Sequence, residues 1–173
     1  MAIYVFGDPQ DEGLAKFAYD SLVNDGISRF FWSYNEGIDL NVLTSKKWEE
    51  LTPEEYEARK KSEFLLGIKP GDYVVHVNLP TWGKVTVCKV VLGYYFQRDL
   101  PEGHNDGRHC LQVNNVFTFD RDDPLVHHEI STRLKLKGSH WKILDEYEKE
   151  FFDSLSSLVL SQLDILRKIM WGR

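Results

Sequence analysis

The sequence predicts an α+β fold, a small and mostly antiparallel β-barrel flanked by helices, with a long helix in its last part. Three observations support this prediction. The chain has 173 residues, which suits one domain over 1–173. Hydrophobic residues make up 42% and aromatic residues 13%, enough to build a core. Runs of β-branched and aromatic residues between tight turns fill the middle of the chain, whereas helical periodicity occurs near both ends.

The first 26 residues are expected to form a strand and a helix ahead of the barrel. Residues 2–6 (AIYVF) are typical of a short strand, and the following Gly-Asp-Pro sequence ends it. After this turn, apolar residues spaced for one face of a helix predict an amphipathic helix that stops before Gly26: Leu14, Phe17, Ala18 and Leu22.

Residues 27–34 are strand-like, and a helix is expected over 39–48 with Asp39 as its N-cap. The next helix has a strong start signal. Thr52 can cap it, a proline occupies its first position, and Glu55 follows Thr52 by three residues as in a capping box. This helix is expected to end near Leu66, before a glycine.

Three strands are expected next, over 73–78, 84–96 and 109–119. Tight turns separate the first two, and a polar loop over 97–108 separates the second from the third. Residues 132–137 are predicted as a short strand or a helical turn.

A long helix is expected over 145–170. Its apolar residues recur every three or four positions and form one stripe, which other apolar residues widen. This width predicts burial on more than one side of the helix, an interface with a partner, or a connection to another domain. The stripe consists of Phe152, Leu155, Val159, Leu163, Leu166 and Met170.

Charge and motifs exclude several classes of function. The net charge of −6 argues against a generic nucleic-acid coat protein, although residues 82–142 carry nine basic against seven acidic residues. Phosphate-binding glycine loops, helical zinc motifs and nucleophile elbows are absent from the sequence, so no catalytic residue, cofactor or metal is expected. No apolar run approaches a membrane span. The only cysteines, Cys88 and Cys110, are too few for a disulfide scaffold, which favours a cytoplasmic location. Cys88 is expected in the core.

The most informative pattern is the placement of aromatic residues at the ends of expected elements. Trp32 and Tyr34 end one strand, Trp48 ends a helix, and Trp82 lies in a turn. The run Tyr-Tyr-Phe at 94–96 ends the longest strand. Because loops at element ends form pockets, this pattern predicts an aromatic pocket for a flat or cationic group.

Several segments resemble the PUA-like superfamily, and the EVE and YTH domains in particular. They occur in the same order as in those domains, and the resemblance spans residues 28–141. It implies a pseudo-barrel that binds RNA or DNA, often through a flipped and modified base, and that in bacterial defence proteins precedes a restriction-type nuclease. The segments are SRFFWSY (28–34), Trp48, GDYVVHVN (71–78), KVTVCKV (84–90), DGRHCLQV (106–113) and RLKLKGSHW (133–141).

The resemblance and the polar positions around it define the expected site, which has a base-binding pocket and a set of cations that contact the nucleic-acid backbone. The base-binding pocket consists of Trp32, Ser33, Tyr34, Asn35, Trp48, Asn78 and Trp82. The cations expected to contact the nucleic-acid backbone are Arg29, Lys84, Arg98, Arg108, Arg133, Lys135 and Lys137.

The predicted function is therefore a non-catalytic nucleic-acid-binding module that recognises a methylated base, as the sensor of a restriction or defence system with a fused or partner nuclease. Two alternatives remain. One is a small amidohydrolase that acts on modified nucleosides, like the related ASCH branch, for which Lys84, Thr86 and Glu63 are the plausible suppliers. The other is a protein-interaction module that uses the helix over 145–170.

Overall fold

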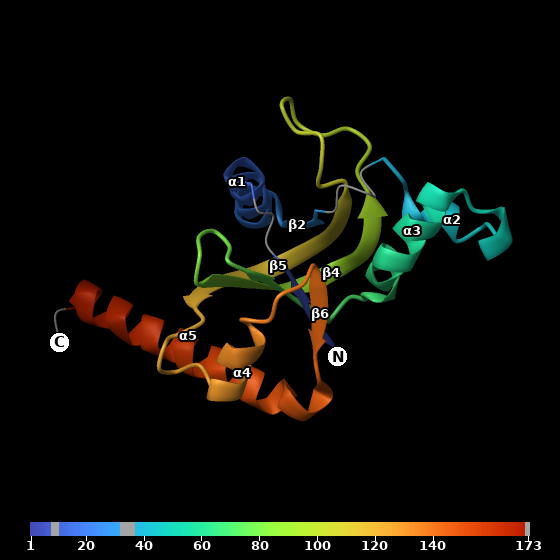
Figure 1. The fold of residues 1–173 in the computed structure, drawn as a ribbon. Coiled ribbons are helices and arrows are strands. Elements are labelled where there is room, and N and C mark those ends of the chain that lie inside the picture. Colours follow the sequence, from blue (N-terminus) through green and yellow to red (C-terminus); the bar gives the residue numbers. More distant parts are fainter. Residues whose placement is uncertain (8–10, 32–36, 172–173) are drawn as a thin grey trace.

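The structure is a computed structural model that describes residues 1–7, 11–31 and 37–171. In this part of the chain, six strands form one sheet in the order β2-β5-β4-β3-β1-β6. The sheet curls into a half-barrel (Figure 1). Neighbouring strands are antiparallel except for β1 and β3, which are parallel. The strands are β1 (Ile3–Phe6), β2 (Ile27–Phe30), β3 (Tyr73–Val77), β4 (Lys84–Phe96), β5 (His109–Asp120) and β6 (His140–Ile143).

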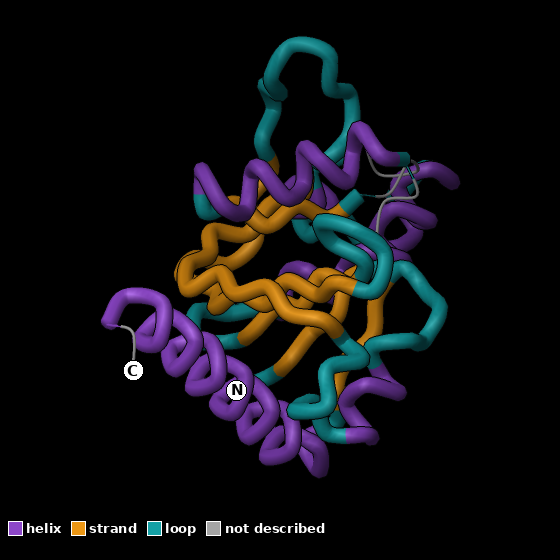
Figure 2. Tube along the Cα trace, turned by 90° about the vertical axis from the view of Figure 1, so that its left-hand side faces the viewer, coloured by secondary structure: helices purple, strands orange, loops and turns teal. Residues whose placement is uncertain are grey.

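Five α-helices are described, and they lie on both sides of the sheet (Figure 2). Asp11 caps the first helix by accepting a hydrogen bond from Leu14 N at 3.0 Å. This helix continues as a π-helical turn over Ser21–Asp25, and Gly26 ends it with a φ of 65°. The helices are α1 (Glu12–Asp20), α2 (Leu40–Leu43), α3 (Pro53–Ser62), α4 (His128–Arg133) and α5 (Glu148–Trp171).

The alternation of side chains along the strands divides the interior into two cores. In β1, Phe6 faces a core shared with α1, α2 and the 3₁₀ turn after α3, whereas Ile3 and Val5 face the other. In β3, Val74 belongs to the first core and Val75 to the second. The second core is completed by α4 and by the first half of α5. The sheet is therefore covered by helices on both faces.

The capping box that the sequence predicts is confirmed. Thr52 Oγ1 accepts a hydrogen bond from Glu55 N, and Glu55 Oε2 accepts one from Thr52 N. A 3₁₀ turn over Glu63–Gly67 follows α3, so helical structure ends where the glycine predicts. The long strand β4 also matches its predicted bounds, with breaks in its register to β5.

Other elements differ from their predictions. The helix expected over 39–48 is only one turn long, because α2 ends at Leu43 and a separate 3₁₀ turn covers Trp48–Glu50. For residues 132–137, the predicted helical turn agrees with the structure better than the predicted strand, but the helix α4 begins earlier, at His128. β6 was not predicted. Residues 1–26, expected ahead of the barrel, contribute β1, which lies inside the sheet between β3 and β6.

The sheet has β2 and β6 at its two ends, so the small, mostly antiparallel barrel that the sequence predicts is present as a half-barrel. The two ends approach each other through side chains. The rings of Phe30 in β2 and His140 in β6 have centroids 6.0 Å apart, and His140 stacks on Phe64 at 3.7 Å. Within the described ranges, no helix is both long enough and apolar enough to cross a membrane.

Candidate nucleic-acid interface

Four residues of the predicted pocket, Trp32, Ser33, Tyr34 and Asn35, lie outside the described residues. They belong to the segment between β2 and α2. A cleft of about 510 Å³ lies beside α2 and the end of β4, and its lining begins with Gly37, the next described residue. Its lining combines aromatic, apolar, cationic and acidic side chains. The lining residues are Gly37, Ile38, Asp39, Val42, Leu43, Glu55, Phe96, Arg98 and Arg108.

The cleft brings together two predicted cations, Arg98 and Arg108, with Phe96 from the aromatic end of β4. The antiparallel pairing of β4 and β5 places Phe96 opposite His109, and Gln97 N extends the ladder by donating to Arg108 O at 2.8 Å. One guanidinium nitrogen of Arg108 donates to the backbone oxygen of Arg98. The two arginines are therefore held together at the mouth of the loop over 97–108.

Tyr94 ties the end of β4 to α2. Its hydroxyl accepts a hydrogen bond from Leu40 N at 3.2 Å and lies 3.0 Å from His109 Nδ1. Burial raises the pKa of the Tyr94 hydroxyl, so this group stays neutral and can donate to the histidine. This contact holds α2 against the end of β4 beside the cleft.

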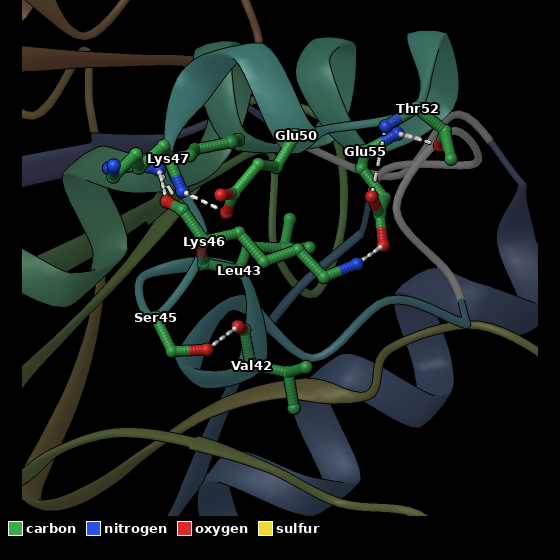
Figure 3. A network of polar contacts seen from close by, with 9 residues as sticks. Val42, Leu43, Ser45, Lys46, Lys47, Glu50, Thr52 and Glu55 are labelled. Carbon is green, nitrogen blue, oxygen red and sulfur yellow. Dashed lines mark hydrogen bonds and ion pairs between the residues drawn. The ribbon is translucent and has the colours of Figure 1, made fainter.

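The acidic side of the cleft comes from Asp39 and Glu55. Asp39 caps α2, with Oδ1 accepting from Asn41 N at 3.0 Å. Glu55 is held on both oxygens, by Lys46 Nζ at 2.5 Å and by Thr52 N at 3.0 Å, as Figure 3 shows. The hydrogen bond from Lys46 lowers the pKa of the Glu55 carboxyl. The sequence identifies Asp39 and Glu55 only through their helix-capping patterns. Their position in the cleft depends on strands that are distant in the sequence.

Trp48 does not line the cleft. The Arg59 guanidinium carbon lies 4.2 Å from the centroid of its ring, and Tyr56 packs edge-on at 5.4 Å. Arg59 is itself held by Glu63 and by the backbone oxygen of Lys46. A cation from α3 therefore covers one face of the ring that was predicted to stack on a base.

Trp82 and Asn78 lie in the β3–β4 turn, at the opposite end of β4 from Phe96. Trp82 is 79% exposed, and the guanidinium carbon of Arg121 lies 4.8 Å from the ring centroid. Asn78 Oδ1 accepts hydrogen bonds from Gly83 N and from Arg121 Nη1, so it organises this turn. The structure does not bring Trp48, Trp82 and Asn78 together, and the prediction that they form one pocket is wrong.

Arg29 is a second correction, because it is only 2% exposed and cannot contact a nucleic-acid backbone as predicted. Its Nε donates to Ser21 Oγ at 2.8 Å, and its Nη1 donates to Gly107 O at 2.7 Å. The Phe17 ring lies beneath the guanidinium at 4.5 Å. Arg29 is thus a structural residue that ties β2 to the π-helical turn and to the loop over 97–108.

The remaining predicted cations do not line the cleft. Lys84 forms an ion pair with Asp120 at 3.4 Å, at the far end of β4. Arg133 packs over the Tyr147 ring at 3.5 Å. Lys135 pairs with Asp122, and Lys137 is exposed between α4 and β6.

The three residues considered for amidohydrolase chemistry have separate partners. Glu63 pairs with Arg59, whereas Lys84 pairs with Asp120. The Thr86 hydroxyl is buried and bonds to Leu79 O and Thr118 Oγ1. Among the described residues, no three histidine, cysteine or acidic side chains gather into a cluster that could hold a metal ion.

No model of a known protein family matches the chain. No curated protein matches it significantly. The resemblance to the PUA-like superfamily thus stays a prediction from the sequence segments, and the chemistry of the cleft carries the functional argument.

Proposed function

We propose that the cleft beside α2 binds one nucleotide of a single-stranded or unpaired nucleic acid and recognises its base, with preference for a methylated form. The observation that carries the proposal is the convergence of Phe96 with Arg98 and Arg108 in one cleft of about 510 Å³. This volume lies in the usual range of small-ligand sites. The role is binding without catalysis, as the sensor of a system whose cleavage step a fused or partner nuclease would supply.

Each kind of lining residue has a part in this proposal. Arg98 and Arg108 offer guanidinium groups to phosphate oxygens. Phe96 offers a ring for base stacking, which contributes about 1–3 kcal/mol per base. The Asp39 carboxylate can accept a hydrogen bond from an exocyclic amino group of a base. Val42 and Leu43 supply the apolar wall that a methyl group would contact.

The electrostatics favour a short contact over a long one. The chain carries a net charge of −6, which disfavours contact between a polyanion and the parts of the surface that lie outside the region of the two arginines. With two phosphate contacts, the logarithm of the affinity for a single strand should fall with the logarithm of salt at a slope of about −1.4. A base pocket must therefore supply most of the selectivity.

The test is fluorescence anisotropy with labelled single-stranded RNA and DNA that contain unmodified or methylated adenine or cytosine, at about 50 mM and about 200 mM salt. The double variant Arg98→Ala/Arg108→Ala should raise the Kd at least about 10-fold through the loss of charged hydrogen bonds. The matched control is Lys142→Ala/Lys149→Ala, which removes the same charge from exposed positions away from the cleft.

Tighter binding of a methylated strand, lost in the arginine variant and kept in the lysine variant, supports the proposal. Absence of binding to every strand at low salt overturns it. An equal loss in both double variants also overturns it, because net charge rather than the cleft would then govern binding.

A further inference from the structure

The second half of α5 carries a large exposed apolar surface. Eight apolar residues of this half are between 40% and 73% exposed. The C-terminal stripe, as we name it, runs along the centre of this surface with a spacing of four, three and four residues. It consists of Val159, Leu163, Leu166 and Met170, with Leu160, Ile165, Ile169 and Trp171 at its sides.

The first half of the same helix is packed against the body of the protein. Phe151 and Leu158 are buried in the second core, and Phe152 packs edge-on against Tyr73 with centroids 5.0 Å apart. The C-terminal part of α5 runs past the sheet (Figure 1). The C-terminal stripe therefore belongs to an ordered helix that the rest of the described chain leaves uncovered.

The area of the C-terminal stripe and its sides is that of a protein interface. At the exposures given, the eight residues present on the order of 800 Å², which is what each partner contributes to a standard interface. The largest apolar patch on a monomer is usually about 300–600 Å². We propose that the C-terminal stripe pairs with the same stripe of a second copy of this chain, in an antiparallel two-fold dimer.

The helix surface has the shape that such pairing needs. A hollow of about 410 Å³ lies on α5, lined by Leu160, Ser161, Leu163, Asp164 and Arg167. Four of these residues are spaced i, i+3, i+4 and i+7, which is the outline of a hole that receives a side chain from a facing helix. The hole lies along one edge of the C-terminal stripe, because Leu163 is its only lining residue in the stripe itself. A two-fold pairing uses each such hole and each such side chain twice, because both copies present the same surface.

The edge of the C-terminal stripe carries both acidic and basic residues, so the charges of one copy can pair with opposite charges of a second copy. In an antiparallel pairing centred between Ile165 and Leu166, Asp164 of one copy lies level with Arg167 of the other, and the reverse contact forms by symmetry. Within one copy, Asp164 pairs with Lys168 at 3.4 Å. Residues 159–171 carry one acidic and two basic residues, so two copies repel each other little at this surface. The antiparallel arrangement also places the remaining, acidic parts of the two copies at opposite ends of the helix pair.

Sedimentation velocity of the full chain over a concentration series tests this proposal. The wild-type protein should sediment as a dimer at high concentration and dissociate on dilution. Leu166→Glu places a charge in the apolar interface and should raise the dimer Kd at least about 100-fold. The matched control is Ser157→Glu, which introduces glutamate at an exposed polar position of the same helix outside residues 159–171.

A dimer that Leu166→Glu dissociates and Ser157→Glu preserves supports the proposal. A wild-type chain that stays monomeric at every concentration overturns it. A dimer that persists unchanged in Leu166→Glu also overturns it, because the contact would then lie elsewhere. Nucleotide binding in the cleft is measured separately, so either proposal can fail without the other.

Discussion

His76 Nε2 lies 2.9 Å from Ser28 Oγ, and this bond crosses the interior of the curled sheet. His76 belongs to β3 and Ser28 to β2, and two other strands separate them in the order of the sheet. Both side chains are buried, and the His76 ring packs edge-on against Phe6 with centroids 5.3 Å apart. A polar bond thus joins opposite sides of the half-barrel within an aromatic environment.

Acid should unfold the protein partly through His76. Burial lowers the pKa of His76 from 6.5 to about 3. Between these values the unfolded state binds a proton that the folded state does not, so stability is complete above about pH 6.5 and falls as the pH decreases toward 3. The slope from this group is at most about 1.4 kcal/mol per pH unit. Urea unfolding at a series of pH values measures it.

The control for this prediction is His76→Gln, which keeps a hydrogen-bonding side chain but does not titrate. The variant should be less stable near neutral pH, and its stability should depend less on pH between about 6 and 3. An unchanged pH slope in the variant would show that other groups govern the acid transition.

Gly107→Ala should destabilise the fold. Gly107 has a φ of 91°, and a Cβ there would lie 2.7 Å from a ring carbon of Phe31. We expect a loss of about 2–4 kcal/mol, from strain together with the displacement of the ring. Gly103→Ala separates the two causes, because Gly103 has a φ of 87° with no atom within 4 Å of its Cβ. Thermal unfolding should rank wild type first, then Gly103→Ala, then Gly107→Ala, and equal stability of the two variants would contradict the steric argument.

Arg29→Lys should also destabilise the protein, although it keeps the charge. A lysine cannot reproduce the two directed hydrogen bonds to Ser21 Oγ and Gly107 O. Chemical denaturation should show a loss of about 2–3 kcal/mol. Arg98→Lys, at the cleft, is the matched control and should change stability little. If both variants unfold like the wild type, Arg29 is not the structural residue described above.

Both thiols should react slowly in the folded protein. Cys88 and Cys110 are buried, and burial raises the pKa of both thiols, that of Cys110 to about 11. Because the thiolate is the reactive form, a disulfide reagent at about pH 8 should label them fast only after denaturation. Fast labelling of the native protein would indicate that one of these sites opens. Cys110→Ser would then show which thiol reacts.

Local signals predicted much of the fold. The capping box of Thr52 and Glu55 spans only four residues, and the apolar run of β4 identifies a strand without reference to the rest of the chain. β6 carries no such signal. It has four residues and pairs in the described sheet with β1, from the opposite end of the sequence. A strand defined by so distant a partner cannot be recognised from its own composition.

The site was predictable only in part, for a related reason. Arg98 and Arg108 could be singled out as cations in a polar loop, and Phe96 as an aromatic residue at a strand end. Trp48 and Trp82 carry the same signal at element ends, yet neither lines the cleft, and an arginine lies over one face of each ring although Trp82 is 79% exposed. Which aromatic residue lines the cleft depends on non-local contacts, and sequence position does not reveal them.

The position of β1 has a consequence for synthesis of the protein. β1 leaves the ribosome before the other five strands of the described sheet, but its neighbours are residues 73–76 and 140–143. Such long sequence separations slow folding, because large loops must close before the contacts form. The nascent chain therefore holds β1 unpaired until residues 73–76 have emerged. Removing residues 3–6 would separate β6 from the rest of the sheet, because β1 lies between β3 and β6.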